Sequence, residues 1–118
     1  MTIAAVAGAI AVGLGAFGAH YVKDLLTPSR FDVYLTGARY LMVHAVILLV
    51  AARMYREEPS RLLSSACLAF FTGMIMFSGS LVLLGLTGVR FLGAIAPVGG
   101  TGYILGWLLL AAAVWRRG

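Results

Sequence analysis

Charged residues are scarce in this chain: Asp, Glu, Lys and Arg make up only 11% of its 118 residues. Soluble domains usually carry about a quarter charged residues, because a small domain needs a polar surface around its core. Hydrophobic residues account for 62% of the chain, and the mean hydropathy is +1.00. This composition argues against a soluble enzyme, a disordered tail and a secreted disulfide-rich module, and it places the protein in a membrane.

Several chemical groups are also missing. The single cysteine, Cys67, excludes an intramolecular disulfide and a cysteine-based zinc cluster. The sequence contains no nucleophile paired with a base, no paired carboxylates, no phosphate-binding loop and no metalloprotease helix. We therefore predict no catalytic residues, no metal site and no cofactor, and we expect a protein that is not an enzyme.

The net charge is +5, and the isoelectric point is near 10. This excess of basic residues does not indicate nucleic-acid binding, because the basic residues form no stripe. They lie instead in short gaps between apolar runs, where positive charge orients membrane helices. No nucleic-acid partner is expected.

The charge-free runs predict four membrane spans, at about residues 3–22, 36–55, 62–86 and 96–115. A spanning helix needs about 20 mostly apolar residues, and the second span reaches that length only if Arg39 and Arg53 extend toward the interfaces. Its alternative is a partly buried or interfacial helix. The first span lacks the basic segment of a cleaved signal peptide. We predict an all-α integral membrane four-helix bundle with short loops, formed by one domain over residues 1–118.

The connections between spans carry their own signals. Thr27 followed by Pro28 is typical of a helix start. Apolar residues then recur at helical spacing from Phe31 to Ala38, which predicts a short interfacial helix ahead of the second span. Residues 58–60 predict a tight turn around Pro59.

Pro97 fits the first turn of the fourth helix better than its middle. Phe91–Ala96 is therefore expected near the interface or as a short re-entrant segment. The glycines after Pro97 would then make a flexible helix start, whose free N–H groups could face an anion such as a lipid phosphate.

An even number of spans puts both termini on one side of the membrane. The basic residues divide five to four, which slightly favours cytoplasmic termini by the positive-inside rule. The terminal side carries Arg53, Arg56, Arg61, Arg116 and Arg117, and the other side carries Lys23, Arg30, Arg39 and Arg90.

Small residues repeat along three of the spans, and such residues allow close helix contact in lipid. They predict a tight bundle, or alternatively a face for self-association. They are Ala7, Ala11, Gly15 and Ala19 with Gly18 in the first span, Ser65, Ala69 and Gly73 in the third, and Gly99, Gly102 and Gly106 in the fourth.

His20 and His44 are the only histidines, and each lies in an apolar run. An ionisable residue inside a membrane is a functional candidate, and two histidines could bind a haem iron, a metal or a proton. Their depths differ by about 10 Å at ~1.5 Å per residue, so they need not meet. The alternative is that each forms a hydrogen bond to a neighbouring helix or to interfacial water.

Three further polar residues lie within predicted spans. Arg39 could pair with Asp32 if the helix between them is continuous, or it could extend toward the headgroups. Ser78 and Ser80 flank Gly79 and could form hydrogen bonds between helices or to a carbonyl of the preceding turn.

Several segments together resemble one small family of membrane proteins, the YgdD-like family known as domain of unknown function 423. The segment from Leu14 to His20 reads LGAFGAH, Phe77 to Leu81 reads FSGSL, and both match signatures of that family. Further matches are Tyr40 with His44, Pro97 with Gly99 and Gly100, and Gly106 with Trp107. One position differs, since Val82 stands where the family often has an aromatic residue. The resemblance implies a four-helix protein of the bacterial inner membrane with no established activity.

Three functions follow as hypotheses. The first is a non-enzymatic protein that acts through helix assembly or lipid contact, with membrane lipids, a second copy or another membrane protein as partner. The second is a small transporter or channel module with a polar lining. The third is a haem- or metal-binding helper of a membrane complex. The polar lining would come from His20, His44, Arg39, Ser78 and Ser80.

Overall fold

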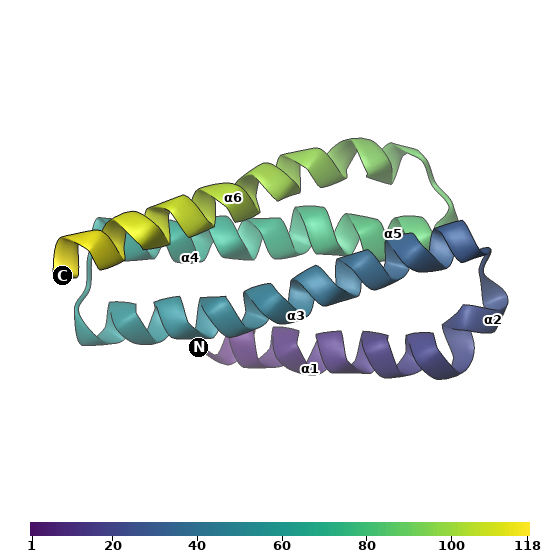
Figure 1. Cartoon of the computed structure of the whole chain (residues 1–118), viewed down its shortest axis with the longest axis horizontal. Coiled ribbons are helices and arrows are strands. Elements are labelled where there is room, and N and C mark those ends of the chain that lie inside the picture. Colours follow the sequence, from purple (N-terminus) through teal and green to yellow (C-terminus); the bar gives the residue numbers. More distant parts are fainter.

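The computed structural model describes all of residues 1–118, which form four long helices and no strand (Figure 1). A π-helical segment interrupts both the first and the third helix. The first helix comprises α1 (Thr2–Phe17), η1 (Gly18–Val22) and α2 (Lys23–Leu25). The second is α3 (Pro28–Glu57). The third comprises α4 (Arg61–Gly73), η2 (Met74–Gly79) and α5 (Ser80–Thr87), and the fourth is α6 (Phe91–Arg117).

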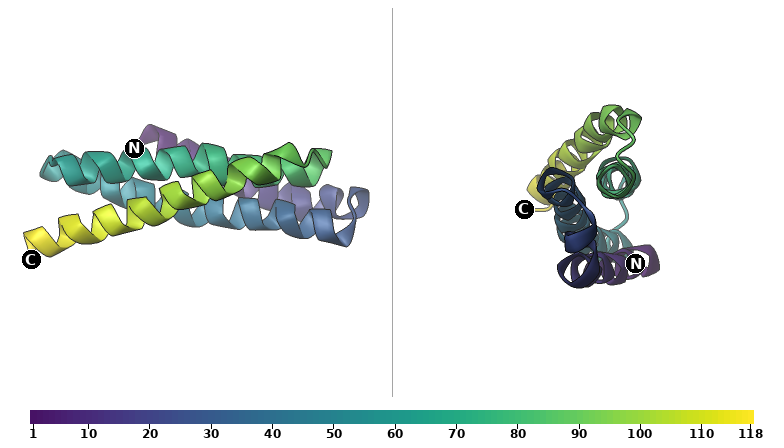
Figure 2. Two further views of the ribbon diagram at one scale, coloured as in Figure 1. Left: turned by 90° about the horizontal axis from the view of Figure 1, so that it is seen from above. Right: turned by 90° about the vertical axis from the view of Figure 1, so that its right-hand side faces the viewer.

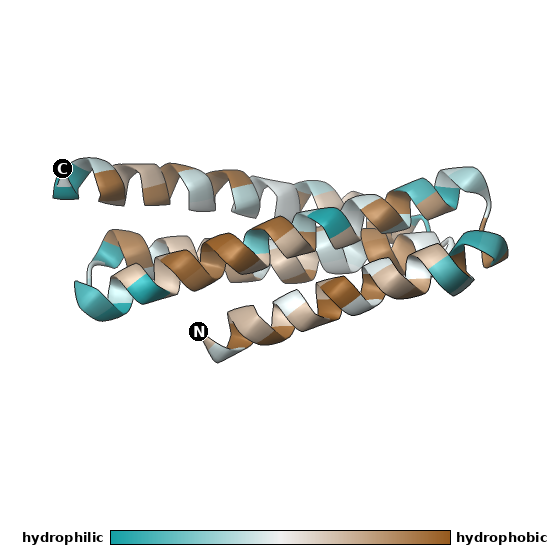
Figure 3. Cartoon of the chain, turned by 60° about the horizontal axis from the view of Figure 1, so that its bottom comes forward, coloured by the Kyte–Doolittle hydropathy of each residue, from teal (hydrophilic) through white to brown (hydrophobic).

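All four helices are long and apolar enough to cross a membrane. Apolar residues dominate their middle portions, and polar residues gather at the ends of the bundle (Figure 3). The bundle is 48 Å long, which exceeds the ~30 Å hydrocarbon core of a bilayer and leaves room for the headgroup regions. The prediction of an all-α four-helix membrane bundle is confirmed.

Local sequence signals explain where the helices begin and end. The Thr27 hydroxyl accepts a hydrogen bond from the Arg30 N–H ahead of Pro28, and the Ser60 hydroxyl accepts one from the Leu63 N–H. Such caps satisfy backbone N–H groups that have no partner within the helix. Gly88 ends α5 with a φ of 73°, a left-handed conformation that glycine adopts without steric cost.

The predicted interfacial helix before the second span does not exist as a separate element. Residues 28–57 form one continuous helix of 30 residues, because no proline follows Pro28 until Pro59. The apolar face from Phe31 to Ala38 is instead part of the bundle core. Tyr34 is fully buried there and contacts both Gly18 and Gly85.

The predictions around Pro97 are also wrong. The fourth helix begins at Phe91, so Pro97 lies inside it and Phe91–Ala96 is neither re-entrant nor separate. A proline removes one helical hydrogen bond and crowds the carbonyl four residues earlier, which here belongs to Gly93. The helix nevertheless continues across Pro97, and Gly99 two residues later packs against the backbone of Met76 and Phe77.

The helices are arranged unequally around α3. The first helix packs against α3 and makes no comparable contact with the other two helices. The third helix packs against both α3 and α6, and α6 lies closest to α4. The end-on view in Figure 2 shows α1 and the third helix apart from each other, with α3 beside both.

Glycines produce the closest contacts, although not always those predicted. A Cβ atom on Gly99 would lie 2.2 Å from the Phe77 nitrogen, and one on Gly18 would lie 2.9 Å from the Tyr34 ring. Gly100 and Gly102 make looser contacts with the third helix. Gly15 differs from the prediction, because it is exposed. A Cβ atom on Gly15 would meet no atom of another helix within 4 Å. The buried residues of the first helix are Ala4, Ala7, Ala11 and Gly18, so its contact face departs from the predicted four-residue stripe.

Two arginines connect helix ends across the bundle. The Arg30 guanidinium donates to the carbonyls of Gly85 and Leu86 at 2.9 and 2.7 Å. At the opposite end, Arg117 donates to the carbonyls of Met54 and Glu58 at 3.0 and 2.8 Å. Arg30 thus binds carbonyls in the last turn of α5, where helical partners are missing, and Arg117 binds the end of α3, where the Met54 carbonyl also accepts from the Glu58 N–H.

Candidate functional site

His44 lies at the centre of a polar and aromatic cluster between α3 and α6. Its Nδ1 atom lies 2.7 Å from the Tyr40 carbonyl, and its Nε2 atom accepts a hydrogen bond of 3.0 Å from the Trp107 indole. The histidine is 4% exposed. Both ring nitrogens therefore have partners inside the bundle.

These two hydrogen bonds define the state of the imidazole. An indole N–H can only donate, so Nε2 accepts and carries no proton. A carbonyl can only accept, so Nδ1 carries the proton and donates to Tyr40. The hydrogen-bond network thus assigns a neutral Nδ1–H tautomer. A metal or haem iron could bind Nε2 only after displacing Trp107.

The imidazole also stacks on an aromatic ring. The ring centroids of His44 and Tyr103 are 3.6 Å apart, with an angle of 12° between the planes. The Tyr103 hydroxyl lies 2.7 Å from the Ser78 hydroxyl in a buried hydrogen bond. Ser78 is therefore linked to His44 through Tyr103, and no buried side-chain N or O atom in the protein is left without a partner.

Two glycines make room for this cluster. A Cβ atom on Gly73 would lie 2.3 Å from the Tyr103 ring, and one on Gly106 would lie 2.7 Å from the Phe70 ring. Tyr103 and Trp107 are four residues apart on α6, so both side chains project from one face of that helix. We call the set His44, Ser78, Tyr103 and Trp107, with the Tyr40 carbonyl, the His44 cluster.

The other predicted polar residues do not join the His44 cluster. His20 is exposed on η1, whereas His44 faces α6, so the structure does not bring the two histidines together. Ser80 is buried, but the Tyr103 hydroxyl bonds to Ser78 rather than to Ser80. No group of three or more His, Cys, Asp or Glu side chains converges anywhere in the chain.

Arg39 points away from the bundle. It is exposed on α3, about 16 Å along the helix from Pro28 at ~1.5 Å per residue. The helix to Asp32 is continuous, yet neither of the two ion pairs in the structure involves Arg39. The N–H groups after Pro97 are not free for an anion either, since this segment lies within α6.

The open side of the bundle contains an apolar groove between α1 and the third helix. We call it the α1 groove; its volume is about 510 Å³. Its lining is almost entirely hydrophobic, and the exceptions are Thr2, Ser78 and Gly79. The lining residues are Thr2, Ile3, Val6, Ala7, Ile10, Leu14, Leu41, Phe71, Met74, Ile75, Ser78, Gly79, Val82 and Leu83.

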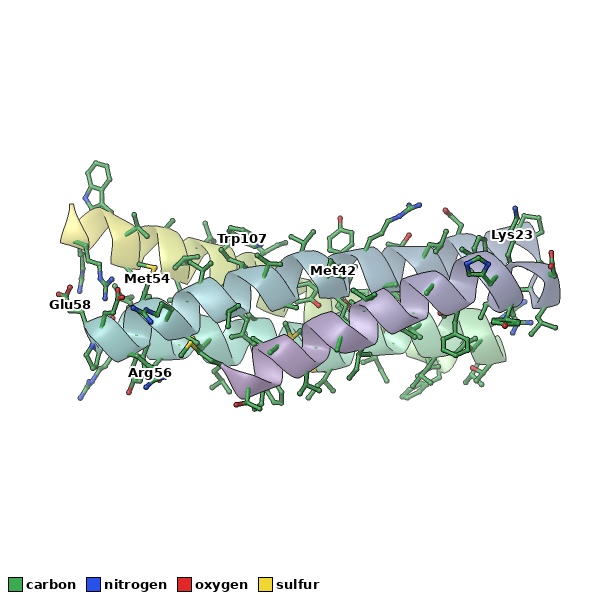
Figure 4. The ribbon with its side chains drawn as sticks, turned by 90° about the horizontal axis from the view of Figure 1, so that it is seen from below. Lys23, Met42, Met54, Arg56, Glu58 and Trp107 are labelled. Carbon is green, nitrogen blue, oxygen red and sulfur yellow. The ribbon has the colours of Figure 1, made fainter.

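The sequence alone identified His44 and Ser78 but not their partners. Tyr103 and Trp107 are spaced like any pair of aromatic residues on one helix face, and only Gly73, which lies opposite Tyr103, hints at a bulky neighbour. The α1 groove left no signal in the sequence, because it depends on which helices are neighbours. Trp107 lies on α6 between the two ends of the bundle and donates to His44 on α3 (Figure 4).

Comparisons with known proteins agree with this architecture. A family model described as a protein of unknown function, DUF423, matches residues 14–100. A UPF0382 membrane protein of Staphylococcus epidermidis is 41% identical over 107 residues, which cover 91% of this chain and 87% of that protein.

Two further relatives come from other bacteria. The UPF0382 membrane protein YwdK of Bacillus subtilis is 37% identical over 94% of this chain and 91% of its own length. The UPF0382 inner membrane protein YgdD of Escherichia coli is 31% identical over 98% of this chain and 88% of its own length. No solved structure matches the chain.

Proposed function

Because the chain belongs to the DUF423 family of membrane proteins, whose activity is not established, we propose a function from its geometry. The protein acts without catalysis, by binding the acyl chain of a membrane lipid in the α1 groove. The groove is the observation that carries this proposal, since it is a hollow of about 510 Å³ that is lined almost entirely by hydrophobic residues.

The chemistry of the groove favours an acyl chain over another helix. Large aliphatic side chains form its exposed rims, among them Ile3, Val6 and Ile10 on α1 and Ile75 opposite. Helices that associate in lipid usually meet through small residues, which let their backbones approach closely. A flexible hydrocarbon chain can fill the irregular space between aliphatic side chains instead.

The length of the groove also suits a lipid tail. Its residues on the third helix run from Phe71 to Leu83, a distance of about 18 Å at ~1.5 Å per residue. One leaflet of the ~30 Å hydrocarbon core is about 15 Å deep. The groove can therefore shelter the full tail of one lipid along the axis of the bundle.

The alternative functions gain less support. A transporter would need polar residues along a shared path, but Arg39 and His20 are exposed on separate helices and His44 is enclosed. A haem or metal helper would need a free histidine nitrogen inside the bundle, and both nitrogens of His44 have partners.

We further propose that the protein lies in the bacterial inner membrane, with both termini in the cytoplasm. The Escherichia coli relative is named an inner membrane protein. Both termini lie toward the same end of the bundle (Figure 1), and this end carries five of the nine basic residues, in agreement with the positive-inside rule.

Filling the groove tests the lipid-binding proposal. Gly79 lines the α1 groove, and a Cβ atom there would meet only the Met74 carbonyl at 3.6 Å, so Gly79→Leu places a side chain in the groove. Gly15→Leu adds the same side chain to the open outer face of α1. Native mass spectrometry from mild detergent is expected to show retained lipid on the wild type and on Gly15→Leu, and to show its loss from Gly79→Leu.

Gel filtration and thermal unfolding of both variants check that each remains folded. A wild-type protein without retained lipid, or a folded Gly79→Leu protein that retains lipid as the wild type does, would contradict the proposal.

A further inference from the structure

We infer that the lipid bound by the α1 groove is an anionic phospholipid, and that Arg56 binds its phosphate. This inference rests on the proposed function and specifies its ligand. The argument starts from what lies between the groove and the end of α3.

Two smaller hollows extend the α1 groove toward the end of the bundle that carries Glu58. The first shares Ile3 and Phe71 with the groove and is lined only by hydrophobic residues. The second shares Met1, Ala52 and Cys67 with the first. The second hollow is the polar end of this path, and its remaining residues are Tyr55, Arg56 and Ser64.

The second hollow lies at the depth of the lipid headgroups. Arg56 is one residue from the end of α3 and Ser64 is in the first turns of α4. Figure 4 shows Arg56 at the same end of the bundle as Glu58 and far from Lys23. From Ser64 to Phe71 the path covers about 10 Å along the third helix. A headgroup beside Arg56 therefore directs its tail through the first hollow, and the far part of the tail enters the α1 groove.

Arg56 is the arginine on this path whose charge is not already balanced. Arg53 pairs with Glu57 at 2.8 Å, and Arg117 lies 3.5 Å from Glu58. Neither ion pair involves Arg56, and the second hollow contains no carboxylate. The two glutamates at this end are thus occupied by other arginines, which leaves the potential beside Arg56 positive.

The side chains of the second hollow match a phosphate ester. A guanidinium presents paired donors that fit two phosphate oxygens. Tyr55 and Ser64 line the same hollow, and each has a hydroxyl group that can act as a neutral donor. A zwitterionic headgroup would bring a cation next to Arg56, whereas an anionic phospholipid brings none.

Lipid titrations followed by native mass spectrometry test this inference. Phosphatidylglycerol and phosphatidylcholine with identical acyl chains are added to delipidated full-length protein. We expect the wild type to bind phosphatidylglycerol about tenfold more tightly, a difference of about 1.4 kcal/mol, and this preference to weaken at high salt. Arg56→Gln is expected to lose the preference and keep its affinity for phosphatidylcholine, while Arg56→Lys keeps part of it.

Arg116→Gln is the matched control. It removes one positive charge at the same end of the bundle, from a separate hollow beside Glu58 and Arg61, and it is expected to leave the preference unchanged. A preference that survives in Arg56→Gln, or that falls equally in Arg116→Gln, would overturn the inference.

The two proposals fail in different ways. Equal wild-type affinity for both lipids would overturn the anionic preference and leave acyl-chain binding in place. Failure of the wild type to bind either lipid would overturn both, and Gly79→Leu is expected to lose affinity for both lipids together.

Discussion

The two sides of α3 are built differently. Toward α6 and the third helix, α3 meets aromatic rings, closely approached glycines and the hydrogen bonds of the His44 cluster. Toward the first helix, it meets alanines, one closely approached glycine (Gly18, against Tyr34) and one side-chain hydrogen bond, from the Tyr34 hydroxyl to the Leu14 carbonyl. One side of the bundle is closed around polar groups, and the other side is open beside an apolar groove.

This difference shows what polar residues contribute inside a membrane. Lipid removes the hydrophobic driving force between helices, so tight packing and hydrogen bonds must hold them together. The closed side has both, which defines one arrangement of α3, the third helix and α6. The first helix has few of these contacts, and it remains the wall of a groove that a lipid can fill.

The largest expected loss of stability comes from a substitution that adds a methyl group on the closed side. Gly99→Ala places Cβ 2.2 Å from the Phe77 nitrogen, and because backbone cannot move aside easily, we expect a loss of about 3 kcal/mol in the free energy of unfolding. The same change at Gly15 meets nothing and should leave stability equal or slightly higher. Unfolding in detergent measures both, and equal stability of the two variants would show that the closed side is not tightly packed.

A smaller effect is expected from His44→Phe. The phenyl ring keeps the stacking on Tyr103, but the Trp107 N–H loses its acceptor in surroundings without water, which costs about 1–3 kcal/mol. His20→Phe changes an exposed residue and should alter stability little. The fluorescence of Trp107 and Trp115 during unfolding measures the stability of both variants. A folded His44→Phe protein with wild-type stability would exclude a stabilising role for the His44 cluster.

The smallest effect is expected on the open side. Tyr34→Phe removes the hydroxyl bond to Leu14, at a cost near the ~0.6 kcal/mol average for hydrogen bonds between membrane helices. Its effect should be local, with faster amide hydrogen exchange in the first helix and unchanged exchange in α6. Tyr21→Phe alters an exposed tyrosine of the same helix and serves as the control. Faster exchange throughout the bundle would mean that the two sides are not independent.

Much of the fold was predictable from local signals. The four spans, the helix start at Thr27 and Pro28, and the turn around Pro59 depend on neighbouring residues. The predictions around Pro97 and the separate interfacial helix were wrong for a shared reason. Both predictions considered only the residues of the segment itself. Packing against the third helix keeps the fourth helix continuous across Pro97, and contact with Gly18 and Gly85 buries Tyr34.

The candidate site was predictable only in part. His44 and Ser78 were conspicuous as polar residues within apolar runs, but the sequence offered no means of choosing their partners. The LGAFGAH segment overlaps the start of the π-helical segment Gly18–Val22. The FSGSL segment overlaps the end of the other π-helical segment, Met74–Gly79. π-Helical segments often occur at functional sites. The composition of neither motif predicted a π-helical segment.

The sequence by itself determined that this protein is helical, that it lies in a membrane and that it has four spans, because each of these depends on how residues close in the chain transfer from water to lipid. The tertiary structure alone decided that His44 is neutral and enclosed by Trp107 and Tyr103, that His20 and Arg39 are exposed, and that a groove opens between α1 and the third helix. These features depend on which helix faces lie against each other. In lipid, two kinds of contact between helices select the faces that pack together: glycines against aromatic rings, and hydrogen-bond donors against acceptors.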